Sequence, residues 1–185
     1  MRTKTSYASF LRQMIVFAML GSLMFVSDLA MEFLPNIHIV GALTMVYTVV
    51  YRAKALIPLY VYVFLNGIYA AASGTLLWWI PYLYVWTVLW GVTMLLPKRM
   101  PPKIAVPVYM AVCAAHGLCF GILYAPAQAL LFDLSWNKML LWIAAGFPFD
   151  AIHAVGNLAA GCLIFPLAQA LGKLERVFND TKEDC

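Results

Sequence analysis

Three polar residues within an apolar stretch near the end of the chain have the types and spacing that could serve chemistry or ligand binding. Asp150, His153 and Asn157 stand at positions i, i+3 and i+7, which places them on one face of an α-helix. Polar groups are costly in lipid and usually face a cavity or a partner helix. Two interpretations stay open: the stripe lines a ligand site, or Asp150 and His153 pair and lock neighbouring helices together.

Two carboxylates nearer the N-terminus extend this set. Asp28 and Glu32 are spaced i, i+4 at the end of the first apolar segment. Asp28 lies deeper in that segment, so we expect it to point inward, whereas Glu32 equally suits a helix end in water. Asn157 is the best candidate for direct ligand contact, because an amide can both donate and accept hydrogen bonds.

Aromatic residues gather in two regions, 78–90 and 136–149. Trp and Tyr concentrate at membrane interfaces in any case, but rings that also fold over a polar cavity offer stacking faces to a planar ligand. We expect one such face from each region. The predicted substrate site consists of Asp28, Trp79, Trp136, Asp150, His153 and Asn157.

Several chemistries lack their motifs. The sequence contains no GxxxxGK[ST] phosphate loop, so the chain is not expected to hydrolyse ATP itself. It also lacks HExxH, GxSxG and CxxC, so we predict no catalytic residues, no metal and no cofactor. An intramembrane enzyme with Asp150 and His153 as an acid–base pair is a weaker alternative, because no nucleophile accompanies them.

The elements that must position these residues follow from composition. The 185 residues are 64% hydrophobic and only 11% charged, whereas soluble domains are about 45–50% apolar and about 25% charged. A helical membrane crossing needs about 20 apolar residues, so the chain has room for roughly six. We predict an all-α integral membrane protein, a single domain over 1–185 built as a bundle of six transmembrane helices.

Uncharged stretches give the expected boundaries. Gly146 and Pro148 should interrupt the apolar run before the last crossing, which leaves 134–147 as an external loop or a short interfacial helix. Residues 173–185 carry charges of both signs and are expected to form a cytoplasmic tail. The six crossings are predicted at about 11–33, 37–52, 55–73, 78–97, 105–125 and 149–171.

The basic residues predict the orientation. With crossings at these positions, eleven of the twelve Lys and Arg residues fall on one side of the membrane and only Lys138 falls on the other. Such a bias marks the cytoplasmic side, so both termini are expected in the cytoplasm. The net charge of +4 is thereby explained by topology and by contact with the lipid bilayer, and no nucleic acid partner is expected.

A patch of small residues marks a candidate surface for a membrane partner. Ala18, Gly21 and Ser22 lie close together on the first predicted helix, and small residues allow two membrane helices to approach closely. The segment Ala18–Ser22 resembles the docking motif of energy-coupling factor (ECF) transporter S components, the substrate-binding membrane subunits of vitamin importers. The segment Gly146–Asn157 is similar to the start of the last helix in many such subunits. The resemblance covers about residues 8–172.

This resemblance implies a function. S components capture a vitamin or precursor at the outer face of a bacterial plasma membrane, and they deliver it together with a transmembrane coupling subunit and two ATPases. Metal-specific members begin with a Met-His segment, whereas this chain begins Met1-Arg2, which disfavours a metal substrate. Stacking faces together with Asp150 and Asn157 suit a planar nitrogen heterocycle, such as a pyrimidine, pterin, flavin or deazapurine.

Two further alternatives remain beside the enzyme. A membrane scaffold of the rod-shape type would have a similar size and number of crossings, and its polar stripe would hold the bundle together. A secondary transporter normally has two repeated halves, and the sequence shows no internal repeat.

Overall fold

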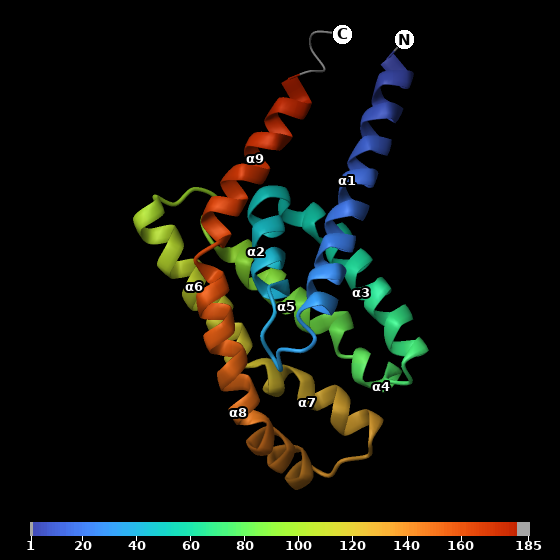
Figure 1. The fold of residues 1–185 in the computed structure, drawn as a ribbon, viewed down its shortest axis with the longest axis vertical. Helices are drawn as coiled ribbons and strands as arrows, with labels where there is room; N and C mark the ends of the chain where they lie inside the picture. Colours follow the sequence, from blue (N-terminus) through green and yellow to red (C-terminus); the bar gives the residue numbers. More distant parts are fainter. Residues whose placement is uncertain (1, 181–185) are drawn as a thin grey trace.

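The computed structural model describes the backbone of residues 2–180 and the side chains of residues 7 and 9–177, and within that range the chain is helical without strands. The helices form an elongated bundle with both termini at one end (Figure 1). This confirms the all-helical fold. In chain order they are α1 (Arg2–Ala30), α2 (Val40–Tyr51), the 3-10 turn η1 (Arg52–Ala55), α3 (Leu56–Ala72), α4 (Leu76–Trp79), α5 (Tyr82–Leu95), α6 (Pro102–Leu118), α7 (Phe120–Leu131), α8 (Trp136–Gly161) and α9 (Ile164–Asp180).

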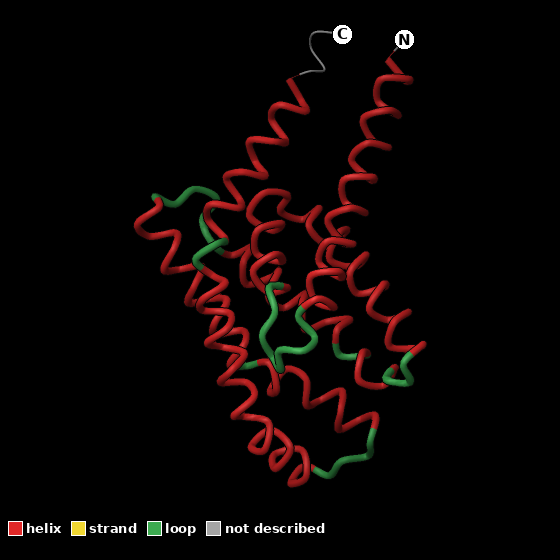
Figure 2. The backbone as a smooth tube through the Cα atoms, viewed as in Figure 1, coloured by secondary structure: helices red, strands yellow, loops and turns green. Residues whose placement is uncertain are grey.

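Helix α2 forms the centre of the bundle. Every residue from Val40 to Thr48 is buried, because α2 is apolar around its whole circumference and therefore needs neighbours on all sides. Helices α1, α5, α6, α8 and α9 all contact it. The loop of residues 31–39, which leads into α2, runs across the middle of the view in Figure 2.

Polar side chains at the C-terminal half of α2 tie it to three neighbours. The Tyr47 hydroxyl donates to the carbonyl of Leu20 in α1 at 3.2 Å, and the Tyr51 hydroxyl donates to Glu175 in α9 at 2.8 Å. Just beyond α2, the Arg52 guanidinium donates to the carbonyl of Met94 in α5 at 2.5 Å. These bonds fix the register of α2 against its three neighbours.

Small residues bring the paired outer helices together. A Cβ atom placed on Gly21 of α1 would lie 2.6 Å from Val61 and 2.7 Å from the carbonyl oxygen of Pro58 in α3. Likewise, a Cβ on Gly161 of α8 would lie 2.7 Å from the Cα of Met110 in α6. Glycine is required at both contacts because the helix backbones approach too closely for any side chain.

Among its described residues, the structure has fewer candidate membrane crossings than the six predicted from the sequence. Five helical segments are long and apolar enough to cross a membrane, namely Ser9–Ala30, Val40–Ala72, Leu76–Leu95, Pro102–Leu131 and Trp136–Gly161. The second of these is broken at Arg52, whose φ of 56° turns the chain, so α2 and α3 are separate helices. The structure is therefore that of a multi-pass membrane protein, while the sixth crossing stays a prediction.

The sequence was misleading near the end of the chain. We expected a break at Gly146 and Pro148, but α8 runs through both as one helix of 26 residues. A proline removes one backbone donor and crowds one carbonyl, and membrane helices tolerate this where neighbouring groups compensate. The break comes instead at Cys162 and Leu163, inside the predicted crossing 149–171. Residues 181–185 of the predicted tail lie outside the described residues.

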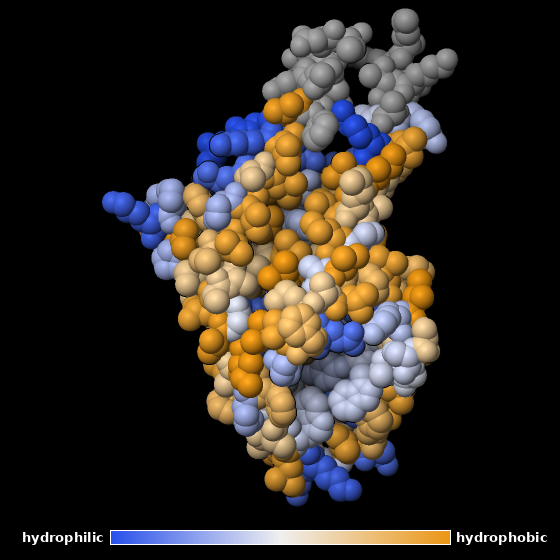
Figure 3. All heavy atoms as spheres, viewed as in Figure 1, coloured by the Kyte–Doolittle hydropathy of each residue, from blue (hydrophilic) through white to orange (hydrophobic). Residues whose placement is uncertain are grey.

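Hydrophilic residues gather at the two ends of the long axis, and an apolar belt lies between them (Figure 3). The connections that carry Arg52, Lys54, Lys98 and Arg99 lie toward the end that bears both termini (Figure 1). Helix α4 and the start of α8, with Lys138, lie toward the other end. This arrangement agrees with the division of charge on which the predicted orientation depends.

The close contact between α1 and α3 generates a stability prediction. Gly21→Ala should lower the melting temperature in detergent, because its methyl group overlaps with Val61 and Pro58, and overpacking costs about 1–3 kcal/mol. The matched control is Gly91→Ala in α5, where a Cβ meets nothing within 4 Å and where alanine should be neutral or stabilising by up to about 1 kcal/mol. Equal melting temperatures for the two variants would contradict the packing.

Candidate ligand-binding cavity

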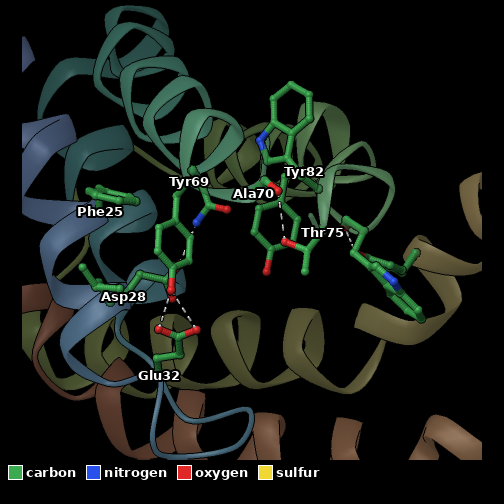
Figure 4. Close-up of a pocket in the computed structure, with 12 residues that line it drawn as sticks. Phe25, Asp28, Glu32, Tyr69, Ala70, Thr75 and Tyr82 are labelled. Carbon is green, nitrogen blue, oxygen red and sulfur yellow. Dashed lines mark hydrogen bonds between the residues drawn. The ribbon is translucent and has the colours of Figure 1, made fainter. Parts of the chain in front are cut away.

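A cavity of about 240 Å³ lies in the half of the molecule away from the termini. Its walls come from α1, α3, α4, α5 and α7, and Figure 4 shows its lining residues. They are Phe25, Asp28, Leu29, Glu32, Asn66, Tyr69, Ala70, Thr75, Trp78, Trp79, Tyr82 and Tyr124. We call this space the aromatic cavity, because six of its twelve lining residues are aromatic.

A hydrogen-bonded carboxylate forms one wall of the aromatic cavity. Asp28 Oδ2 accepts hydrogen bonds from the Tyr62 hydroxyl at 2.8 Å and from Asn66 Nδ2 at 3.1 Å. No described residue donates to Asp28 Oδ1, so that oxygen is available to a ligand. Both donors come from α3, so the packing of α3 against α1 orients the carboxylate before any ligand arrives.

A second carboxylate lies at the rim of the cavity. Glu32 is exposed, and both of its carboxylate oxygens accept hydrogen bonds from the Tyr69 hydroxyl, at 3.3 and 3.1 Å (Figure 4). Asp28 and Glu32 are the charged residues of the lining, which contains no Lys, Arg or His. The cavity therefore favours a ligand with a positive charge or with several hydrogen-bond donors.

Hydrogen bonds fix the Trp79 ring and the backbone of Trp78 in α4. The Trp79 indole donates from Nε1 to the carbonyl of Val63 at 2.8 Å, and a Cβ on Gly67 would lie 2.8 Å from its ring. The carbonyl of Trp78 accepts a hydrogen bond from the Tyr124 hydroxyl. Because the Trp79 ring is positioned in advance, stacking of a planar ligand against it would cost the protein little conformational freedom.

The polar stripe of α8 has a different environment. Asp150 accepts hydrogen bonds from the backbone N–H of Gly121 at 3.1 and 3.2 Å. Gly121 is the second residue of α7, and N–H groups in the first turn of a helix have no partner within the helix. The carboxylate thus caps α7 and also suits the positive end of its dipole. No hydrogen bond between Asp150 and His153 is present among the described residues.

Asn157 is also engaged in packing. Its Nδ2 donates to the carbonyl of Cys113 in α6 at 3.2 Å, and its side chain lies 2.9 Å from where a Cβ on Gly117 would be. On its other side it faces Gly41 of α2. Asn157 therefore fills the junction of three helices.

Three histidines meet around one tryptophan between these helices. The rings of His38 and His153 lie 4.6 Å apart between centroids, and Trp86 lies 5.6 Å from both His38 and His116. We call these four residues the histidine cluster. Burial lowers the pKa of His38, and the nearby Asp28 carboxylate opposes this shift.

The histidine cluster has unused hydrogen-bonding capacity. His116 Nε2 lies 3.1 Å from the carbonyl oxygen of Val85, which can only accept, so Nε2 carries the proton and Nδ1 is an acceptor. Buried polar atoms almost always have partners, so unpaired ones call for an explanation. The buried atoms without one in the described part of the chain are His38 Nδ1, Thr44 Oγ1, Trp86 Nε1, His116 Nδ1, Gln128 Nε2, His153 Nε2 and Asn157 Oδ1.

A layer of aromatic rings separates the aromatic cavity from the histidine cluster. Tyr82 lines the cavity and lies 5.8 Å from Trp86 and 6.4 Å from Phe120. The Phe120 ring in turn lies 4.9 Å from that of His153. The two regions are therefore neighbours, and Tyr82 both lines the cavity and contacts Trp86 of the cluster.

The structure divides the predicted substrate site. Asp28 and Trp79 line the aromatic cavity, whereas Asp150, His153 and Asn157 are buried behind it. Trp136 does not line the cavity, and its side chain is 69% exposed at the start of α8. Trp142 does not line the cavity either, but it stacks on the lining residue Tyr124 with the ring centroids 6.0 Å apart and the rings 9° from parallel.

Sequence reasoning left several lining residues out of the site. Asn66 is a polar residue in an apolar stretch and carries the same signal as Asn157, so it could have been selected. Tyr69 and Tyr124 carry no such signal, because their spacing matches that of many interfacial tyrosines. Only the packing of α3 and α7 reveals their place.

The predicted docking patch is also divided. Ala18 and Ser22 are exposed on α1, but Gly21 is buried against α3. The exposed surface around Ala18 and Ser22 is a shallow apolar groove whose other lining residues are Ile15, Met19, Leu20, Leu23 and Val26.

Comparison with known protein families, with curated proteins and with solved structures finds no match to this chain. Among the described residues, no group of three or more His, Cys, Asp or Glu side chains is arranged to hold a metal ion.

The cap on α7 generates a prediction. Gly121→Ala should lower the melting temperature, because its methyl group would overlap with the Asp150 carboxylate and leave a buried N–H unpaired at a cost of about 1–3 kcal/mol. Gly146→Ala in α8 is the control, since a Cβ there meets nothing within 4 Å. If the two variants melt alike, Asp150 is not held by Gly121 and is free to serve a ligand.

Proposed function

We propose that this protein is the substrate-binding subunit of an ECF-type importer and captures a small planar heterocycle in the aromatic cavity. The observation that carries the proposal is the cavity itself, which combines preorganised aromatic rings with two carboxylates and no basic residue. Such a lining would stack against a flat ring and accept hydrogen bonds from amino groups or a cationic nitrogen at its edge.

The position of the cavity agrees with capture from outside the cell. It lies in the half of the molecule away from the termini and from most basic connections. With the orientation predicted from the Lys and Arg residues, this half faces outward from a bacterial plasma membrane. Delivery then requires energy from partners, because the sequence has no phosphate loop of its own.

The exposed small residues of α1 support the choice of partners. Ala18 and Ser22 present little bulk to the lipid side of the bundle, and such positions let a second membrane helix come close. We propose that a transmembrane coupling subunit docks there and connects the protein to two ATPases. Gly21 contributes indirectly by holding α1 against α3.

The polar stripe has a supporting role in this proposal. Asp150 and Asn157 hold α7 and α6 against α8, and α7 supplies Tyr124 to the cavity wall. Loss of the stripe would therefore weaken ligand binding through the position of α7.

The first test concerns the charge of the cavity. Asp28→Asn keeps an oxygen that can accept from Tyr62 and Asn66, so the fold should be retained. It removes the charge that would pair with a cationic ring, and a charge-assisted hydrogen bond contributes about 1.5–3 kcal/mol, or about 10- to 150-fold in affinity. Binding of aminopyrimidines, pterins, flavins and deazapurines would be measured by quenching of tryptophan fluorescence in nanodiscs, since Trp78 and Trp79 line the cavity.

Glu32→Gln is the matched control for this measurement. Glu32 is exposed at the rim, where solvent screens its charge, so its loss should change affinity by only a few fold. The proposal fails if no member of the panel binds, or if Asp28→Asn binds its ligand as tightly as the wild type does.

The second test concerns the partner. Ala18→Trp or Ser22→Trp should abolish copurification of the coupling subunit and ATPases and abolish uptake, because a bulky ring keeps the helices apart. Heterocycle binding by the isolated subunit should be unchanged. Val155→Trp on α8 is the control, since Val155 is also exposed, at 68%. Loss of partners in all three variants, or in none, would refute docking at this patch.

A further inference from the structure

A groove of about 610 Å³ lies toward the opposite end of the molecule from the aromatic cavity. It is enclosed by the end of α2, the connection from α5 to α6, the first turns of α6, and α9. Helix α9 contacts both α2 and α6, so these helices meet on the inner side of the groove. The proposed capture of a heterocycle makes no use of this space.

The inner part of the groove is apolar and its rim is basic. Val49, Phe165 and Ala168 line the inner part, and Tyr109 lies buried beside them. Lys98, Arg99 and Arg176 line the rim, and all three side chains are exposed. An apolar interior below a basic rim matches a ligand that has an apolar chain and an anionic head.

The basic rim has little counter-charge of its own. Glu175 is the acidic residue of the lining, and it already accepts a hydrogen bond from Tyr51 at 2.8 Å. Within the described residues, Arg176 donates from its Nε to the carbonyl of Gly172 at 3.3 Å. Among the described residues, no acidic side chain forms an ion pair with Lys98 or Arg99. The described residues of the rim therefore carry a net positive charge and N–H donors without an acidic partner among them.

The elements that enclose the groove lie toward the end that bears the termini (Figure 1), where hydrophilic residues adjoin the apolar belt (Figure 3). A ligand there would meet the acyl region of a leaflet on one side and its headgroup layer on the other. Basic pockets between helices at this depth suit anionic lipid headgroups, and guanidinium groups form paired hydrogen bonds with phosphate oxygens.

We propose that this groove is a binding site for one anionic phospholipid. The phosphodiester and its headgroup lie among Lys98, Arg99 and Arg176, and an acyl chain lies against Val49 and Phe165. The bound lipid joins α9 to the connection between α5 and α6, two elements that no described ion pair links. The site does not depend on the proposed heterocycle or on the proposed partners.

The test uses the full chain in nanodiscs of phosphatidylcholine with or without phosphatidylglycerol. Native mass spectrometry would count the lipids retained, and thermal melting would measure their effect, since a ligand specific for the folded state raises its stability. The wild type should retain phosphatidylglycerol in preference to phosphatidylcholine and melt at a higher temperature with it. The triple variant Lys98→Gln, Arg99→Gln, Arg176→Gln should lose about 150-fold in affinity, which corresponds to about 1 kcal/mol for each basic residue.

The control removes three basic residues from the same end but outside the groove lining, as Lys54→Gln, Lys103→Gln, Lys173→Gln. It should retain phosphatidylglycerol nearly as well as the wild type does. Equal loss in both triple variants would mean general attraction to an anionic surface and would overturn the site. Inorganic phosphate in detergent is the second arm: stabilisation equal to that by phosphatidylglycerol would overturn the lipid assignment, because the apolar interior would then contribute nothing.

Discussion

The burial of α2 is the constraint on which the rest of the structure depends. A helix that is apolar on all sides is stable when lipid surrounds it, so the hydrophobic effect alone does not explain why α2 lies at the centre of a membrane bundle. What places it there is close packing together with a few polar bonds to its neighbours. Tyr47, Tyr51 and Arg52 direct such bonds to α1, α9 and α5 respectively. Once these three helices surround α2, the pairs α1–α3 and α6–α8 close the bundle from outside.

The polar stripe of α8 likewise joins outer helices through a few hydrogen bonds. Asp150 accepts a hydrogen bond from the backbone N–H of Gly121. This N–H has no partner within a helix because the chain breaks between α6 and α7 at Cys119. Asn157 reaches the backbone of α6 because Gly117 and Gly41 leave room for its amide. A carboxylate and an amide are costly in lipid, and here that cost is offset by two interhelical contacts that apolar residues could not make. The unpaired atoms of the histidine cluster lie beside them and mark where the interior still has capacity for a polar group.

How much of this the sequence could predict depends on the range of the interaction. Hydropathy predicted helices and multiple crossings because the signal is local and strong over about 20 residues. The spacing of Asp150, His153 and Asn157 correctly placed them on one buried face, but it could not say whether that face meets a cavity or another helix. Asp28 was chosen for its depth and does line the aromatic cavity, while Trp136 was chosen for its neighbourhood and does not. The cavity depends on the contact of α4 with α3 at Gly67 and on the contact of α7 with α4 at Tyr124. No periodicity in the sequence reports such contacts.

Helix α1 brings together the two halves of the proposed function. Asp28 lies six residues from Ser22 and ten from Ala18, or about 9 Å and about 15 Å along a helix that rises 1.5 Å per residue. Between these positions Gly21 fixes α1 against α3, and α3 also supplies the two groups that hold the Asp28 carboxylate. A ligand that binds Asp28 and a partner that contacts Ala18 would therefore both act on the pair α1–α3. Any change in the angle between α1 and α3 would alter the position of Asp28 in the cavity and the surface at Ala18 and Ser22. Coupling of this kind needs no long chain of intermediate residues, only one rigid helix pair with two arrangements.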